Sequence, residues 1–94
     1  MRVRWLRAAL ANIDAEAEYI ARDNPAAAVR VVRAITEAVD YLKQYPAIGR
    51  PGRITGTREL VVSDTPYIIP YRIRENEVQI IRVFHAARRW PTKI

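Results

Sequence analysis

The chain begins with an alternation of apolar and basic residues, in which Val3 and Trp5 alternate with Arg2 and Arg4. Successive side chains of a strand point to opposite faces, so this pattern predicts a short, half-buried strand. From Leu6 onward the apolar positions recur every three or four residues, which is the spacing of one helix face. These positions are Leu6, Leu10, Ile13, Ala17 and Ile20. The first part of the chain is therefore expected to form a strand followed by an amphipathic helix.

The side of this first helix opposite the apolar stripe is polar. It carries Asn12, Asp14, Glu16 and Glu18. We interpret these residues as a solvated helix face, with a partner site for the acidic groups as the alternative.

A second helix is predicted directly after Asp23, at Asn24 and Pro25. The Asn24 side chain can accept a hydrogen bond from a free N–H of the first turn, and Pro25 suits the first helical position. The apolar stripe then repeats at Ala28, Val32, Ile35, Val39 and Leu42. We expect this helix to close at Tyr45 and Pro46, because a residue before proline avoids the α region. Two amphipathic helices with a short connection predict an antiparallel helical hairpin.

Three strands are predicted after a glycine-rich loop at residues 47–55. They cover residues 58–62, 67–73 and 78–85, with turns at 63–66 and 74–77. These connections are too short for a crossover, so the strands form an antiparallel meander. Pro70 cannot donate to a ladder, and the middle strand is therefore expected to carry a bulge or to have a free edge there.

The predicted fold is a single α+β domain over residues 1–94, in the order β-α-α-β-β-β. The helical hairpin packs on a small antiparallel sheet, which the N-terminal strand extends. Half of the 94 residues are apolar. A chain of this size buries roughly 60–65% of its unfolded surface, so a packed core is expected rather than disorder.

Composition excludes several kinds of site. The chain has no cysteine and one histidine, so it has neither a disulfide framework nor a credible ligand set for a metal. We expect no cofactor. No apolar run approaches the roughly 20 residues that span a bilayer, and the start lacks the pattern of a signal peptide. The predicted location is the cytoplasm, without membrane contact.

The positive charge is concentrated in the second half of the chain. The net charge is +6, and residues 47–94 supply nine basic against four acidic residues, or +5 of that total. Such an asymmetry favours a polyanionic partner, either nucleic acid or an acidic protein segment. A solvated basic surface that serves solubility is the alternative.

Basic and aromatic side chains are the candidates for binding a target or nucleic acid. They are Arg50, Arg53, Arg58, Arg72, Arg89 and Trp90. Guanidinium groups bind phosphate bidentately, and rings stack on bases. His85 is the one side chain whose ordinary pKa lies near neutrality, so it can act as a general acid or base. A lone histidine at a strand end is, however, more often structural.

Five segments in order resemble one family of proteins. They are DNPAAA at 23–28, YPAIGRPGR at 45–53, GTRELVV at 56–62, TPYIIPYRI at 65–73 and RVFHAARRWP at 82–91. Together they resemble the RelE/ParE superfamily of bacterial type II toxin–antitoxin toxins over essentially the whole chain. This resemblance implies a growth-inhibiting toxin that a cognate antitoxin neutralises by wrapping over the helical hairpin and the sheet. It also implies that the toxin–antitoxin complex binds its own promoter DNA through the antitoxin.

The superfamily contains two kinds of toxin, so the resemblance leaves open whether the chain is an enzyme. RelE-like members cut messenger RNA on the ribosome and carry basic residues at positions where this chain has Glu59, Val61 and Ile68. ParE-like members poison DNA gyrase and are not known to need those residues. The resemblance therefore favours gyrase as the target, with a ribosome-dependent endonuclease as the alternative. In that alternative the catalytic residues are His85, Arg82 and Arg88.

Overall fold

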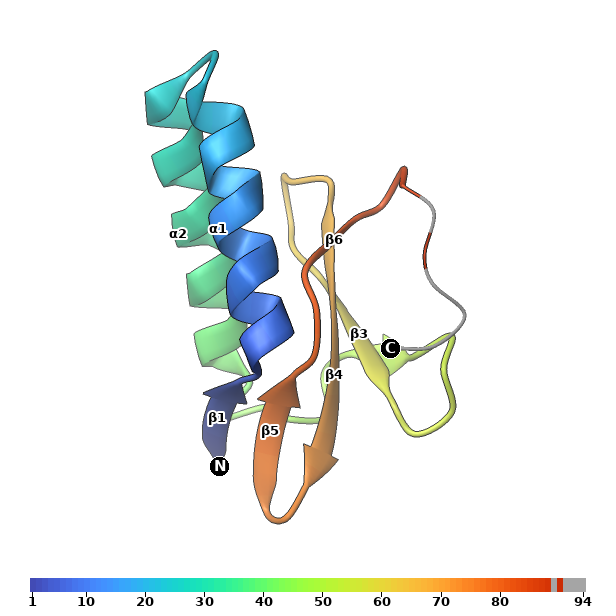
Figure 1. Ribbon diagram of the computed structural model, residues 1–94. Helices are drawn as coiled ribbons and strands as arrows, with labels where there is room; N and C mark the ends of the chain where they lie inside the picture. The colour runs from blue at the N-terminus through green and yellow to red at the C-terminus, as the bar shows by residue number, and fades with distance from the viewer. Residues whose placement is uncertain (89, 91–94) are drawn as a thin grey trace.

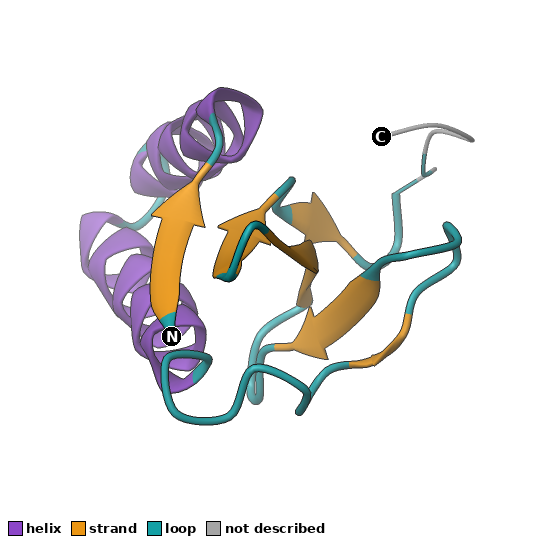
Figure 2. Ribbon diagram, turned by 90° about the horizontal axis from the view of Figure 1, so that it is seen from below, coloured by secondary structure: helices purple, strands orange, loops and turns teal. Residues whose placement is uncertain are grey.

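The computed structural model describes residues 1–88 and Trp90, and they form two layers. The elements are β1 Arg2–Trp5, α1 Arg7–Ala21, α2 Pro25–Tyr41, β2 Arg50–Pro51, β3 Arg58–Val61, β4 Tyr67–Arg74, β5 Glu77–Ile80 and β6 Phe84–His85. Figure 1 shows the two helices running side by side, and Figure 2 shows both on the same side of the strands. The predicted order of elements and the helical hairpin on a sheet are confirmed, with β2 as a further two-residue strand.

The strand order in the sheet is β1-β5-β4-β3-β2, and β6 pairs with β4 beyond the end of β5. The predicted meander is confirmed, because β3, β4 and β5 pair antiparallel. The N-terminal strand extends the sheet as expected, but it pairs parallel to β5, so the sheet is mixed. The predicted third strand at 78–85 is interrupted and forms β5 and β6.

The interruption lies opposite Pro70 in the middle of β4. Between the pair Tyr71–Ile80 and the pair Ile68–Phe84, β4 advances three residues while its partner advances four. Pro70 has no N–H, and its carbonyl accepts a hydrogen bond from the Ile81 N–H at 3.0 Å. The extra residue is a β-bulge. The expectation that the strand of Pro70 itself carries a bulge or a free edge is therefore wrong, because the bulge lies opposite Pro70 on the partner strand and β4 is an interior strand.

Local sequence signals account for the start of α2 and the tight turn after β4. Asn24 Oδ1 accepts a hydrogen bond from the Ala27 N–H at 3.0 Å, and Pro25 opens the helix, as predicted. Glu75 and Asn76 both have positive φ, at 55° and 60°. Positive φ at both central residues is the geometry of a two-residue type I′ hairpin turn, which matches the right-handed twist of the strands.

The second helix ends earlier than the sequence suggests. It ends at Tyr41, and the following residues form turns in which an N–H bonds three residues back, as Leu42 does to Val39 at 3.0 Å. Such bonds tighten the last turn of a helix and satisfy carbonyls that have no helical partner. The expected end at Tyr45 and Pro46 is therefore wrong by about one helical turn.

The core lies between the helices and one face of the sheet. Its largest members are Tyr67, Tyr71, Ile13, Ile35, Leu42, Ile69 and Ile80. The predicted stripe of α2 supplies four buried residues, and its fifth member, Val32, is partly exposed.

The buried face of α1 differs from the prediction. Leu10 is 48% exposed, whereas Ala9 and Glu16 are buried. Asn12 also faces the sheet side, because its Oδ1 accepts a hydrogen bond from the Val83 N–H at 3.1 Å. The interpretation of Asn12 and Glu16 as part of a solvated face is therefore wrong. The small Ala9 lets the helix approach closely, and a partner charge compensates the buried Glu16 carboxylate.

Tyr71 fastens the loop before β2 to the core. Its hydroxyl donates to the Pro46 carbonyl at 2.7 Å and accepts from the Gly49 N–H at 2.9 Å. Gly49 is required here, since a Cβ atom at this position lies 2.6 Å from both Cε1 and the hydroxyl oxygen of Tyr71. Two separate parts of the chain thus meet at one buried hydroxyl.

We expect Tyr71→Phe to destabilise the protein by about 1–3 kcal/mol, because it leaves the buried N–H of Gly49 without its acceptor. Chemical denaturation of the purified protein measures this change. Tyr41→Phe is the control, since Tyr41 is 54% exposed. Equal midpoints for the two variants would contradict the role of Tyr71.

Candidate target-binding face

The sheet face that points away from the helices carries most of the predicted functional side chains, and we call it the outer face. In β4 the residues Tyr67, Ile69 and Tyr71 pack in the core, so the alternating residues Pro70 and Arg72 point to the outer face.

Within residues 1–88 and Trp90, no helix is long and apolar enough to cross a membrane. The same residues contain no group of three side chains suited to hold a metal ion.

Glu59 organises one end of the outer face. Its side chain is 3% exposed, and Oε1 accepts hydrogen bonds from Arg50 Nη2 at 3.1 Å and Nε at 3.3 Å. Its Oε2 accepts from the Arg53 N–H at 2.8 Å, with Arg53 Nε at 3.7 Å. A buried carboxylate needs this compensation. The loop between β2 and β3 is therefore held by one carboxylate.

Trp90 lies between that loop and the end of the sheet. The Arg53 guanidinium lies 3.7 Å from the centroid of the indole ring, which is a cation–π contact. The Phe84 ring packs against Trp90 with centroids 4.7 Å apart. The indole Nε1 is buried and has no hydrogen-bond partner among the described residues. Arg53, Phe84 and Trp90 thus form a stack that ties the C-terminal segment to the loop.

A second buried carboxylate fastens the C-terminal segment to α1. Arg88 Nη1 lies 2.5 Å from Oε1 of Glu16, whose side chain is 9% exposed. The neighbouring Tyr67 packs edge-on against His85 with ring centroids 5.5 Å apart. His85 Nδ1 accepts a hydrogen bond from the Ala87 N–H at 3.2 Å. In this arrangement Nδ1 is an acceptor, so a proton on the neutral ring is carried by Nε2.

The two core tyrosines are held in their protonated form. Burial raises the pKa of Tyr67, and the Glu16 carboxylate adds to this effect. Burial also raises the pKa of Tyr71, against the opposing influence of its bond with Gly49 and the charge of Arg58. Neither hydroxyl is therefore suited to act as a base near neutral pH.

A third carboxylate, Glu77, lies at the opposite end of the outer face from Trp90. It is 5% exposed, and its Oε1 accepts from Gln79 Nε2 at 2.9 Å. Arg4 Nε lies 2.9 Å and Arg2 Nη2 3.4 Å from its two oxygens. The bond from Gln79 and the charges of Arg4 and Arg2 hold the pKa of the Glu77 carboxyl below its usual value, although burial opposes them.

The structure separates the predicted site residues into groups. Arg50, Arg53 and Trp90 come together, and His85 and Arg88 lie beside Tyr67. The other predicted residues make their own contacts: Arg58 donates to the Gly49 carbonyl at 2.8 Å, Arg72 to Gln79 at 2.7 Å and Arg82 to the Ile81 carbonyl at 3.0 Å. Arg89 lies outside the described residues.

Sequence reasoning missed three acidic residues that organise these groups, namely Glu16, Glu59 and Glu77. One signal was present, because Glu16 follows Ile13 by three residues and precedes Ile20 by four. That spacing places it on the apolar side of α1. Glu59 and Glu77 have no comparable signal, since an acid next to an arginine, as at Glu59, or beside a turn, as at Glu77, is common on solvated strands.

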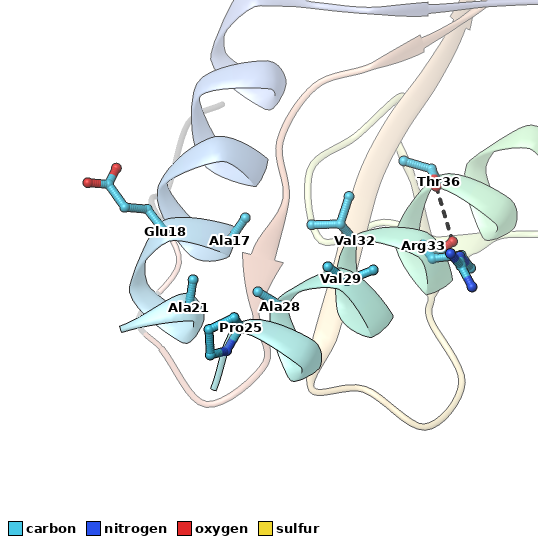
Figure 3. A pocket seen from close by; sticks show the side chains of 9 residues that line it. All are labelled: Ala17, Glu18, Ala21, Pro25, Ala28, Val29, Val32, Arg33 and Thr36. Atoms are coloured by element: carbon cyan, nitrogen blue, oxygen red, sulfur yellow. Dashed lines mark hydrogen bonds between the residues drawn. The ribbon is translucent and has the colours of Figure 1, made fainter. Parts of the chain in front are cut away.

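An apolar groove of about 680 Å³ runs along the helical hairpin. It is lined by Ala17, Glu18, Ala21, Pro25, Ala28, Val29, Val32, Arg33 and Thr36. Figure 3 shows Ala17 and Ala21 of α1 across from Ala28 and Val29 of α2. Small side chains on both helices leave the space between them open, so the groove offers an apolar surface for a partner segment.

Three known proteins similar to this chain are toxins or parts of toxin–antitoxin systems, by their names and descriptions. Residues 3–90 match the family model described as ParE toxin of type II toxin–antitoxin system, parDE. The protein Y4kP of Sinorhizobium fredii, whose name classes it with toxins, is 56% identical over 90 residues, covering 96% of this chain and 93% of its own. Toxin RelE2 of Caulobacter vibrioides is 42% identical over 86 residues, covering 92% and 96%. A solved structure of the chromosomal ParDE TA system from P. aeruginosa is similar with a TM-score of 0.82 and 33% identity, covering 90% and 95%.

Alkaline pH should destabilise the protein through Tyr67. Its folded pKa is raised above the ordinary value of 10.0, so the folded state keeps a proton that the unfolded state releases. The free energy of unfolding is therefore unaffected by this group below pH about 10 and falls as the pH rises above it. Chemical denaturation across this range should show a shallower fall for Tyr67→Phe than for Tyr19→Phe, in which a 61% exposed tyrosine is removed. Identical pH profiles would contradict this assignment.

Proposed function

The chain belongs to the family of ParE toxins of type II toxin–antitoxin systems, and from this membership we propose that it arrests growth by binding and poisoning DNA gyrase. The proposed activity is binding to a target and not RNA cleavage. Since gyrase acts on chromosomal DNA, this activity requires the cytoplasmic location that the sequence predicts.

This proposal rests mainly on one observation: the chain has no basic residue at the positions where RelE-like relatives have basic groups. Glu59 is acidic and is engaged by Arg50 and Arg53, while Val61 and Ile68 are apolar. A ribonuclease of that kind needs positive charge there to stabilise the charge that develops at phosphorus. The Arg88 guanidinium is also bound to Glu16. These contacts favour a surface for binding over a site for RNA cleavage.

A ribosome-dependent endonuclease is the second candidate. His85 is half-buried and lies beside the protonated Tyr67, with Arg88 in the same region. A histidine next to a guanidinium can exchange a proton and stabilise a developing negative charge. The similarity to a relative named Toxin RelE2 also supports this second candidate. In this case His85, Arg88 and Arg82 carry the reaction.

Purified protein should block supercoiling by gyrase and leave messenger RNA on ribosomes intact. His85→Ala should keep the full gyrase effect, because no step of the proposed activity uses the imidazole. The double variant Glu16→Gln/Arg88→Ala should keep it as well, since it removes both charges of this ion pair together and leaves no unpaired buried carboxylate. Cleavage of ribosome-bound RNA that is lost in His85→Ala, without any effect on gyrase, would select the endonuclease.

The family implies a cognate antitoxin, and we propose that the groove between the helices is the site where this antitoxin binds. The groove walls are mostly alanine and valine, with Glu18 and Arg33 at the rim. An amphipathic segment can bury its apolar side in such a groove. Through this antitoxin the complex is expected to bind its promoter DNA.

Val29→Glu should weaken antitoxin binding by about tenfold or more, because it puts a charge into an apolar contact. Val29 is 58% exposed, so the folded chain should tolerate the change. Ile48→Glu is the matched control, since Ile48 is 55% exposed and lies outside this groove. Titration of each variant with purified antitoxin measures the affinity. If Val29→Glu bound the antitoxin as tightly as Ile48→Glu does, this groove would be excluded as the antitoxin-binding site.

A further inference from the structure

The strands β1, β5 and β4 place four arginines in two rows on the outer face. In the first row Arg2, Glu77 and Arg74 are neighbours across the three strands. In the second row Arg4, Gln79 and Arg72 are neighbours in the same way. Residues that pair across a sheet point to the same face, so all four guanidinium groups lie on one side. These four residues are the arginine rows referred to below.

Two buried polar side chains on β5, Glu77 and Gln79, hold the arginine rows in place. Arg4 Nε lies 2.9 Å from Glu77 Oε1, and Arg72 Nε donates to Gln79 Oε1 at 2.7 Å. Gln79 in turn donates to Glu77 at 2.9 Å. Among the described residues, no hydrogen bond uses the terminal nitrogens of Arg4 or Arg72. The Nε contacts of Arg4 and Arg72 thus fix the orientation of their guanidinium groups, and the terminal nitrogens can bind an external anion.

The charge of the arginine rows exceeds what the protein itself neutralises. The two rows contain four arginines and one carboxylate, Glu77, which leaves a net charge of +3 on this patch; of the four, Arg2 and Arg4 contact the carboxylate. Arg2 and Arg74 are exposed, and the Arg2 side chain is 83% accessible. Neighbouring strands lie about 4.8 Å apart and rows two residues apart about 7 Å, so the patch measures roughly 10 by 7 Å. A ligand that matches it must present several negative charges.

We propose that the arginine rows form a binding surface for the phosphate backbone of double-helical nucleic acid. None of the six positions in the two rows is apolar, whereas the centre of a protein–protein interface is depleted of charge and enriched in aromatic residues. Arginine forks match phosphate oxygens bidentately. This proposal does not depend on whether the target of the toxin is gyrase or the ribosome.

A double helix fits better than a single strand. Proteins that bind single strands without sequence preference stack the bases on aromatic side chains. The described aromatic residues of the outer face, Phe84 and Trp90, pack against each other beside Arg53, at the end away from the rows. Arg72 lies four residues from Ile68 along β4, or about 13 Å. The surface is thus separate from the positions used by RelE-like ribonucleases, and its contacts are independent of base sequence.

The test measures the affinity of the purified protein for fluorescently labelled duplex DNA and duplex RNA across a series of salt concentrations. Arg2→Ala/Arg74→Ala removes two exposed charges and leaves Glu77 bound to Arg4 and Gln79. Arg30→Ala/Arg33→Ala is the matched control, because it removes the same charge from exposed positions of α2. Thermal unfolding of both variants checks that they fold.

We expect the first variant to bind duplexes roughly tenfold to a hundredfold more weakly at low salt, and its slope of log K against log salt to fall by about two. The control should keep the wild-type slope, and a scrambled duplex should bind equally well. Binding to only one of the two duplexes supports the proposal and identifies the natural ligand. Equal losses in both variants, or tighter binding of a poly-glutamate peptide than of either duplex, would overturn it.

Discussion

The central strand β4 is buried on both of its faces, and the rest of the architecture follows from covering them. Its first five residues, from Tyr67 to Tyr71, are all buried. The helical hairpin covers Tyr67, Ile69 and Tyr71. On the outer face, Phe84 lies opposite Ile68 and packs against Trp90, which in turn carries Arg53. A strand with two apolar faces needs two covers, so the C-terminal segment serves as part of the fold.

Two buried carboxylates hold the arginines that anchor the C-terminal segment and the loop beside it. Glu59 on β3 holds the loop arginines, and Glu16 on α1 holds Arg88 of the C-terminal segment. Each arginine is about half exposed, so solvent screens part of the attraction, but removing it would leave a buried carboxylate without its compensating charge. Several basic groups that the sequence offers as target contacts are therefore engaged within the protein. The arginine rows on β1 and β4 and the groove on the helices remain as surfaces for partners.

Local chemistry predicted much of this fold. The cap at Asn24 and the hairpin turn at Glu75 and Asn76 depend on one or two residues each, and both are present. Pro70 does disturb the strand pairing, but the bulge lies on the partner strand and not on the strand for which it was predicted. The parallel pairing of β1 with β5 depends on how the helical hairpin returns the chain, which periodicity does not encode. The phase of α1 was missed because a buried glutamate is expected only once its partner is known, and Arg88 lies 72 residues away. The candidate site was predicted as a set of residue types, and its division by Glu59, Glu77 and Glu16 required the tertiary structure.

The most direct test of the proposed mode of action is expression of this chain without its antitoxin in cells that report DNA damage and translation separately. A toxin that binds gyrase should induce the DNA-damage response while protein synthesis continues. This response should persist in a chain with His85→Ala, because the imidazole takes no part in binding. Arrest of translation with cut messenger RNA, and no DNA-damage response, would contradict the account.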